Sequence, residues 1–152
     1  MSLTVVERFA PKTAPRTLEQ TGLRLDTIVQ LLLKTLMFAG ELSGIELADR
    51  LGLAFSVIEP GVDQLKTQRM CEIVGGTSLG APSYRYRITD LGRERAGTFL
   101  DRNMYTGIAP VPLDQYRSYM NAFYRASPTR TSRDQVRQAF AHLVLRDRKS
   151  VV

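Results

Sequence analysis

The sequence is poor in the side chains that build most catalytic and metal centres. Its 152 residues include one cysteine, one histidine and no tryptophan. A single cysteine excludes an intrachain disulfide and fits a reducing cytoplasm, where we expect the protein. One cysteine and one histidine also cannot supply the tetrahedral ligand set of a structural zinc site. The missing tryptophan by itself excludes nothing.

Neither residue is placed for catalysis. Cys71 stands between Met70 and Ile73 at the start of a predicted strand, which favours a buried, inert thiol over a nucleophile. His142 lies among apolar residues of a predicted helix, which favours a packing or surface role over a general base. We therefore predict no enzyme activity, no metal and no cofactor.

Phosphate loops and membrane segments are missing as well. The glycines at 75, 76 and 80 match neither the dinucleotide fingerprint nor a P-loop, which ends in Gly-Lys-Ser/Thr. No apolar run approaches the roughly 20 residues that span a bilayer, and Lys34 interrupts the best one, 29–38. The N-terminus has no apolar stretch typical of a signal peptide. The sequence predicts neither nucleotide binding nor a membrane location.

The order of elements between residues 26 and 103 is the most informative feature that is present. It reads helix, helix, tight turn, helix, strand, glycine-rich tip, strand, helix. This order is typical of the winged helix-turn-helix, so we predict an α+β, mostly helical fold with a two-stranded wing and additional C-terminal helices. The expected elements are helices near 26–38, 44–51 and 56–69, strands near 71–75 and 83–88, and a helix from about residue 89.

Cap residues support these boundaries. Ser43 and Glu46 form a predicted capping box, and Ser56 and Glu59 form a second one four residues after Gly52. Gly40 and Gly52 are natural helix stops. Two short capped helices this close together indicate a helix-turn-helix.

The period of each element predicts which side chains are buried. In the second wing strand, Tyr84, Tyr86 and Ile88 share one face, while Arg85 and Arg87 share the other. The positions that should face the core are Leu32, Leu36, Leu47, Leu51, Val62, Leu65, Ile73, Tyr86 and Ile88.

Four segments follow from this pattern: an N-terminal extension (1–25), the winged helix (26–102), a proline-containing linker (103–112) and a C-terminal helical extension (113–152). The last segment carries amphipathic stripes over 113–124 and after Ser132. Such stripes need a surface to cover. The sequence leaves three candidates for that surface: the winged helix, a second copy of the chain in a homo-oligomer, or a domain beyond Val152.

Charge is distributed unevenly over these segments. The net charge of +6 is made of +2 in residues 1–25, −1 in 26–102 and +5 in 103–152. Nucleic-acid affinity comes mainly from cations at phosphates. A nearly neutral winged helix therefore predicts weak, non-specific binding to duplex DNA at most.

Six residues are the candidate nucleic-acid contacts: Ser56, Gln64, Lys66, Arg69, Arg85 and Arg87. The wing arginines are the best phosphate ligands, and the alternative is that they form a solvated outer face of the hairpin. Glu59 and Asp63 stand where a recognition helix would enter the groove, and their charge opposes phosphate.

Several short motifs resemble a known family. They include Gly40-Glu-Leu-Ser-Gly44, Phe55-Ser-Val-Ile-Glu-Pro60, Ser83-Tyr-Arg-Tyr86, Thr89-Asp-Leu-Gly-Arg93 and Pro110-Val-Pro-Leu-Asp-Gln-Tyr116. Together with similar short runs they cover most of residues 22–146. This region resembles the one that precedes the motor module in a group of bacterial AAA-type ATPases. The resemblance implies a P-loop module following this region, and no ATPase activity in these residues.

Two functions remain open. The first is a non-catalytic winged-helix accessory domain that docks partners for, or regulates, a bacterial AAA-type ATPase. The alternative is a winged-helix transcriptional regulator that binds DNA, most simply as a dimer. The neutral body favours the first, and the wing arginines and high isoelectric point favour the second.

Overall fold

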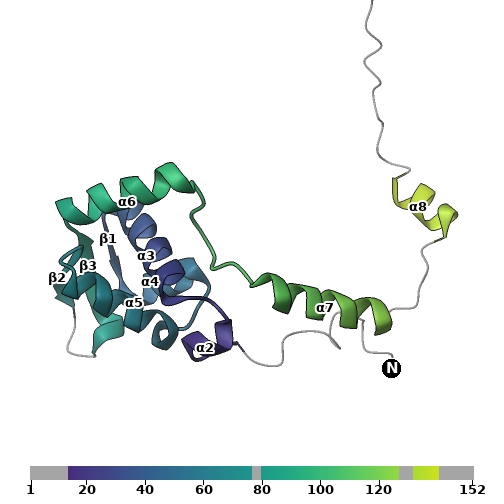
Figure 1. Ribbon diagram of the computed structural model, residues 1–152, viewed down its shortest axis with the longest axis horizontal. Helices are drawn as coiled ribbons and strands as arrows, with labels where there is room; N and C mark the ends of the chain where they lie inside the picture. The colour runs from purple at the N-terminus through teal and green to yellow at the C-terminus, as the bar shows by residue number, and fades with distance from the viewer. Residues whose placement is uncertain (1–13, 77–79, 127–131, 141–152) are drawn as a thin grey trace, which may run out of the picture.

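The computed structural model describes residues 14–76, 80–126 and 132–140 (Figure 1). The elements, in chain order, are α2 (Leu18–Thr21), α3 (Leu25–Ala39), β1 (Glu41–Ser43), α4 (Gly44–Leu51), α5 (Phe55–Thr67), β2 (Cys71–Gly76), the 3₁₀ turn η1 (Ala81–Ser83), β3 (Tyr84–Ile88), α6 (Asp90–Arg102), α7 (Leu113–Ala126) and α8 (Arg133–Phe140). None of the helices within the described residues is long and apolar enough to cross a membrane.

The fold is the predicted winged helix-turn-helix. Helices α3, α4 and α5 pack together, and a three-stranded antiparallel sheet in the order β1-β3-β2 closes the structure beside them. Helix α6 leaves the wing and packs back on α3. Helix α7 follows the extended segment 103–112 and meets the body at its first turn, where the Gln115 side-chain amide donates to the Thr21 carbonyl at 3.2 Å. Beyond this contact, α7 and α8 extend away from the body (Figure 1).

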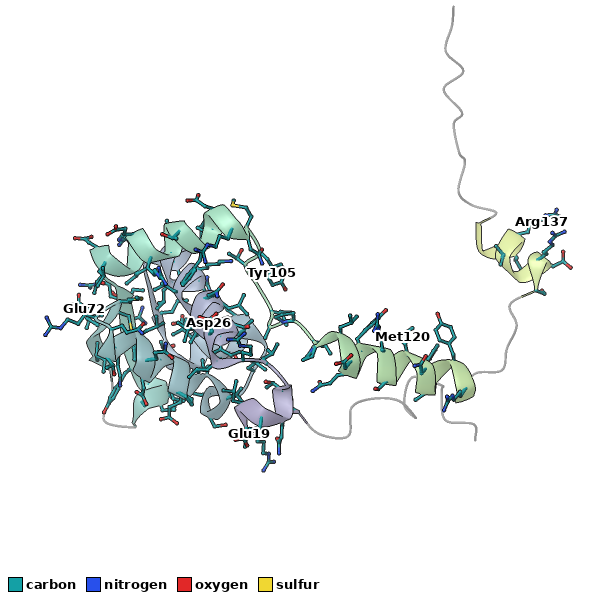
Figure 2. All side chains as sticks on the ribbon, in the orientation of Figure 1. Glu19, Asp26, Glu72, Tyr105, Met120 and Arg137 are labelled. Carbon is teal, nitrogen blue, oxygen red and sulfur yellow. The ribbon has the colours of Figure 1, made fainter. Side chains whose placement is uncertain are left out.

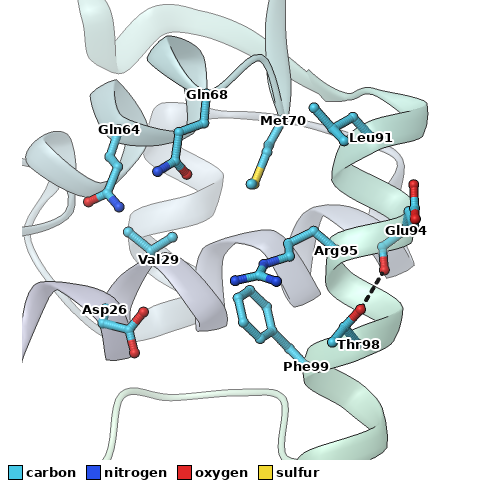
Figure 3. A pocket seen from close by; sticks show the side chains of 10 residues that line it. All are labelled: Asp26, Val29, Gln64, Gln68, Met70, Leu91, Glu94, Arg95, Thr98 and Phe99. Carbon is cyan, nitrogen blue, oxygen red and sulfur yellow. Dashed lines mark hydrogen bonds between the residues drawn. The ribbon is translucent and has the colours of Figure 1, made fainter.

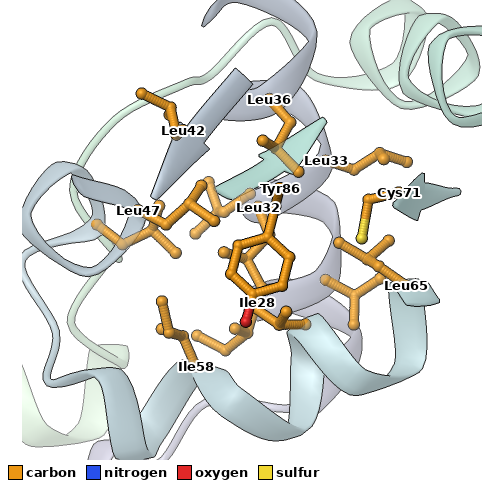
Figure 4. Packing of buried hydrophobic residues seen from close by; sticks show 14 of the residues in the cluster. Ile28, Leu32, Leu33, Leu36, Leu42, Leu47, Ile58, Leu65, Cys71 and Tyr86 are labelled. Carbon is orange, nitrogen blue, oxygen red and sulfur yellow. The ribbon is translucent and has the colours of Figure 1, made fainter. Parts of the chain in front are cut away.

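One hydrophobic core joins the helices to the sheet. The ring of Tyr86, on the central strand β3, lies among leucine and isoleucine side chains of the three helices (Figure 4). Its hydroxyl donates a hydrogen bond to the carbonyl of Ala81 at 2.9 Å, so the buried oxygen is satisfied. Eight of the nine predicted core positions are buried: Leu32, Leu36, Leu47, Leu51, Val62, Leu65, Tyr86 and Ile88.

The ninth position, Ile73, was predicted wrongly, because its side chain is 46% exposed. Ile73 lies opposite Tyr86 on β2, which is an outer strand with a neighbour on one side only. The register of β2 also shifts between Ile73 and Gly75. An edge position next to a bulge receives less cover than the period of the strand suggests.

The first capping box is present as predicted. The Glu46 N–H donates to Ser43 Oγ at 3.2 Å, and the Ser43 N–H donates to the Glu46 carboxylate at 2.7 Å. The hydrogen bond from the Ser43 backbone lowers the pKa of Glu46. Gly52 then ends α4 in the left-handed conformation at φ 65°, as its position predicted.

The second capping box was a wrong prediction. Helix α5 begins at Phe55, and its N-cap is Ala54, which makes no side-chain cap. The Val57 N–H already bonds to the Ala54 carbonyl, so Ser56 lies inside the first turn and cannot cap it. Its hydroxyl donates instead to the carbonyl of Arg16 at 3.0 Å, in the segment before α2.

The strand β1 and the short helix α2 were not predicted. β1 has three residues, too few to show an alternating pattern, and it forms because β3 offers it a partner. Its register pairs Glu41 with Arg87, Leu42 with Tyr86 and Ser43 with Arg85. This pairing places the side chain of Glu41 on the outer face of the wing.

Candidate nucleic-acid interface

The outward side of α5 carries an acidic charge. Glu59 and Asp63 are exposed there, as the sequence suggested. The ammonium of Lys66 lies 2.7 Å from the Asp63 carboxylate, so the nearest cation is already paired. Such an exposed pair contributes little to stability, but it removes most of the net attraction that Lys66 would offer a phosphate.

Gln64 does not belong to that outward side. It is half-buried and lines a pocket between α5, α3 and α6, together with Gln68 and Arg95 (Figure 3). A side chain directed into this pocket does not project with Lys66 toward a groove. The structure therefore separates two residues that the sequence prediction had grouped together.

Arg69, two residues after the last residue of α5, has an unusual backbone conformation. Its φ of 57° is the one positive φ among the described residues other than glycine. The Arg69 carbonyl accepts a hydrogen bond from the Thr89 hydroxyl at 2.8 Å, which ties the turn after α5 to the start of α6. The guanidinium is exposed, and within the described ranges no carboxylate pairs with it.

The two wing arginines share one carboxylate. Arg85 Nε donates to Glu41 Oε1 at 2.6 Å, and the Arg87 guanidinium donates to Oε2 at 3.0 and 3.2 Å. All three side chains lie on the outer face of the sheet because their positions in β1 and β3 are two residues apart or directly opposite. The hydrogen bond from Arg85, followed by that from Arg87, lowers the pKa of Glu41.

The outer face of the sheet is therefore balanced in charge. Glu72 on β2 lies opposite Arg87 in the register, so two carboxylates and two guanidinium groups share this face. The arginines are exposed, with relative side-chain exposures of 48% and 51%, but each is held in an ion pair. No sequence signal marked Glu41, because its role depends on a strand that the sequence did not predict.

Cys71 is buried, as predicted. Its side chain is 4% exposed, and burial raises the pKa of the thiol to about 11. A thiol with this pKa is protonated at neutral pH and is a poor nucleophile. His142 lies outside the described residues, and within them no three His, Cys, Asp or Glu side chains are grouped to hold a metal ion.

Comparisons with known proteins found similarity among solved structures alone. No protein-family model and no curated protein matches the chain, so nothing in these comparisons links it to an ATPase. Among solved structures it is similar to the adhesin competence repressor AdcR of Streptococcus pyogenes, with 15% identity over 81% of this chain and 78% of that chain and a TM-score of 0.39.

It is also similar to the heme sensor protein PefR, in complex with heme and carbon monoxide, with 13% identity over 88% of this chain and 89% of that chain and a TM-score of 0.38. A second PefR structure, from Streptococcus agalactiae with heme, gives 12% identity over 96% and 86% of the chains and a TM-score of 0.35.

Proposed function

We propose that this chain is a non-catalytic winged-helix module that acts by docking a protein partner, and that the partner is an AAA-type ATPase motor. The observation that supports the docking role is the pairing of Glu41 with both wing arginines. A cation contributes to DNA binding when it is free to replace counterions at a phosphate. Arg85 and Arg87 reach a phosphate only by leaving Glu41 or by bringing its negative charge with them.

Helix α7 supplies the docking surface in this proposal. It carries large side chains that are 43–68% exposed, in a helix that projects from the winged helix (Figure 2): Leu113, Tyr116, Tyr119 and Tyr124. Tyrosine and apolar side chains of this kind are enriched at the centres of protein interfaces. The family resemblance of the sequence supports the choice of an ATPase as the partner.

A DNA-binding titration distinguishes the docking role from the alternative, which is sequence-selective DNA binding by this chain. With a random-sequence duplex at about 0.15 M salt, we expect dissociation constants of about micromolar or weaker. Glu41→Gln should strengthen binding and steepen its salt dependence, because it frees two guanidinium groups. Nanomolar, sequence-selective binding by the unaltered chain that is lost in Arg85→Ala and Arg87→Ala would overturn the proposal.

Site-specific cross-linking tests the partner. A photo-reactive phenylalanine analogue replaces Tyr116 in α7, and in a matched control it replaces Arg93, which is exposed on α6. In cells that make the chain naturally, the Tyr116 position should capture a P-loop ATPase that mass spectrometry identifies, and the Arg93 position should not. Equal capture at both positions, or capture of no P-loop protein, would count against the ATPase.

A DNA-binding transcriptional regulator is the second candidate function. The observation that favours it is Arg69, an exposed guanidinium at the end of α5 that no described carboxylate pairs with. If this residue anchors a duplex, Arg69→Ala should weaken binding and reduce the salt slope by about one unit. An unchanged titration would remove this support for the second candidate.

A further inference from the structure

A pocket lies between α3, α5 and α6, and the proposed docking role does not involve it. It has a volume of about 520 Å³, within the range of small-molecule sites in proteins. Its apolar lining comes from Val29, Met70, Leu91 and Phe99, of which Leu91 is the most exposed, and polar groups from all three helices point into it (Figure 3). An apolar wall with a few convergent polar groups is the usual composition of a ligand site.

Opposite charges stand on different helices around this pocket. Asp26 comes from the first turn of α3, and Arg95 comes from α6. Although both line the pocket, no ion pair joins them, and in the described part of the chain Arg95 has no carboxylate partner. The pocket therefore presents the Arg95 cation and the Asp26 carboxylate to a ligand separately, and Glu94 of α6 adds a second carboxylate to the lining.

Neighbouring side chains hold both charged groups in place. The Arg95 guanidinium carbon lies 4.9 Å from the centre of the Phe99 ring, a cation–π contact that keeps the charge above the apolar wall. The Gln30 side chain donates to Asp26 Oδ2 at 2.7 Å, which leaves Oδ1 without a partner among the residues that the structure describes. Each charged group is thus oriented but retains hydrogen-bonding capacity.

Two amides complete the polar lining. The side chains of Gln64 and Gln68, one turn apart on α5 and its C-cap, line the same pocket. Within the described ranges neither side-chain amide has a hydrogen-bond partner in the protein. Carboxamides both donate and accept, so they suit a ligand that carries both kinds of group.

We infer that this pocket binds a small zwitterion of the amino-acid type, with its carboxylate on Arg95, its ammonium on Asp26 and its apolar body on Met70 and Val29. A simple anion is disfavoured because Asp26 and Glu94 give the lining an excess of negative charge. A simple cation would leave the fork-shaped donor of Arg95 unused. A zwitterion satisfies both charges at once, and its apolar side chain covers the wall.

The inference does not depend on the proposed docking role. Its test is a titration of the ¹⁵N-labelled full chain, followed by the amide signals of Gln64 and Gln68 and the Nε–H of Arg95. The ligand probes are L-phenylalanine, N-acetyl-L-phenylalanine, which lacks the ammonium, and L-phenylalaninamide, which lacks the carboxylate. We expect saturable binding of L-phenylalanine and binding weaker by about tenfold or more for each derivative.

Two variants assign the charges, and a third is the control. Arg95→Gln should abolish the preference for L-phenylalanine over its amide, and Asp26→Asn should abolish the preference over the N-acetyl derivative. Arg93→Gln makes the same charge change on the exposed side of α6 and should leave binding unchanged. Thermal unfolding of each variant checks that it is folded.

Three results would overturn the inference. The first is the absence of saturable shifts at these signals with any of the probes. The second is equal binding of L-phenylalanine and its two derivatives. The third is an Arg93→Gln variant that loses binding as much as Arg95→Gln does. Because DNA and partner binding are measured separately, failure here leaves the proposed docking role untouched.

Discussion

The buried ammonium of Lys34 donates to the main-chain carbonyl of Asn103 at 2.5 Å and to that of Tyr105 at 3.3 Å. The side chain of Lys34 is 2% exposed, in the middle of the apolar helix α3. Burial lowers the pKa of this lysine, yet the two carbonyls give the charged form good partners. This contact fixes the path of the chain from the end of α6 toward α7.

Lys34→Met should release that segment without unfolding the body. The carbonyls of Asn103 and Tyr105 belong to exposed residues and can bond to water, while methionine suits the apolar surroundings. We expect the free energy of unfolding to change by no more than about 2 kcal/mol, in either direction. Hydrogen exchange should become faster at the Ala109 amide, which bonds to the Leu51 carbonyl at 2.9 Å.

Lys66→Met is the matched control for this change. Lys66 lies on α5 and pairs with Asp63 at the surface, far in sequence from the segment after α6. Its removal should leave exchange at Ala109 unchanged. Slow exchange in Lys34→Met, equal to that of the unaltered chain, would show that the buried ammonium does not hold the segment.

Ser43→Ala and Ser56→Ala should differ in their effect on stability. Ser43→Ala removes the Oγ that accepts from the Glu46 N–H but keeps the backbone N–H that donates to the Glu46 carboxylate, so it should cost about 1 kcal/mol of unfolding free energy. Ser56 makes one exposed hydrogen bond, to Arg16, and its loss should cost about half as much or less. Urea titration of both variants measures the difference in unfolding free energy. Equal losses in the two variants would show that Ser56 caps α5 after all.

Two glycines of α6 should respond to alanine in opposite directions. A Cβ at Gly92 would lie 2.1 Å from the Met70 carbonyl oxygen, which is backbone and cannot move away easily. We expect Gly92→Ala to destabilise the protein by about 3 kcal/mol or more. A Cβ at Gly97 meets nothing within 4 Å, so Gly97→Ala should stabilise the helix by about 0.5–1 kcal/mol. Denaturation in urea provides both values.

Stability should fall in alkaline solution because of Tyr86. Burial raises the pKa of its phenol from 10.0 to about 12. Between these values the unfolded chain loses the proton and the folded chain keeps it, so the folded state is favoured less as pH rises. The loss is about 1.4 kcal/mol per pH unit above pH 10. Burial also raises the pKa of Cys71 from 9.0 to about 11, so Tyr86→Phe should keep the loss between pH 9 and 11 that comes from the thiol and should lose the slope between pH 11 and 12. An unchanged slope between pH 11 and 12 in this variant would show that Tyr86 is not its source.

The elements of the winged helix could be predicted because their signals are local. The Ser43–Glu46 box, the stops at Gly40 and Gly52, and the alternation of β3 each depend on residues within a few positions of one another. The same reasoning failed at Ser56, where the turn begins earlier than the cap pattern suggests. It failed at Ile73 because exposure at an edge strand depends on what lies beside it.

The sequence by itself thus determined helices α3 to α6, the two-stranded wing and the near-neutral charge of the body. Only the tertiary structure decided which charges meet. Glu41 contacts arginines 44 and 46 residues away, and Lys34 contacts carbonyls 69 and 71 residues away. Asp26, Gln64 and Arg95 likewise line one pocket from three helices. Such pairings depend on strand register and helix packing, which the whole chain sets together, and no local pattern encodes them.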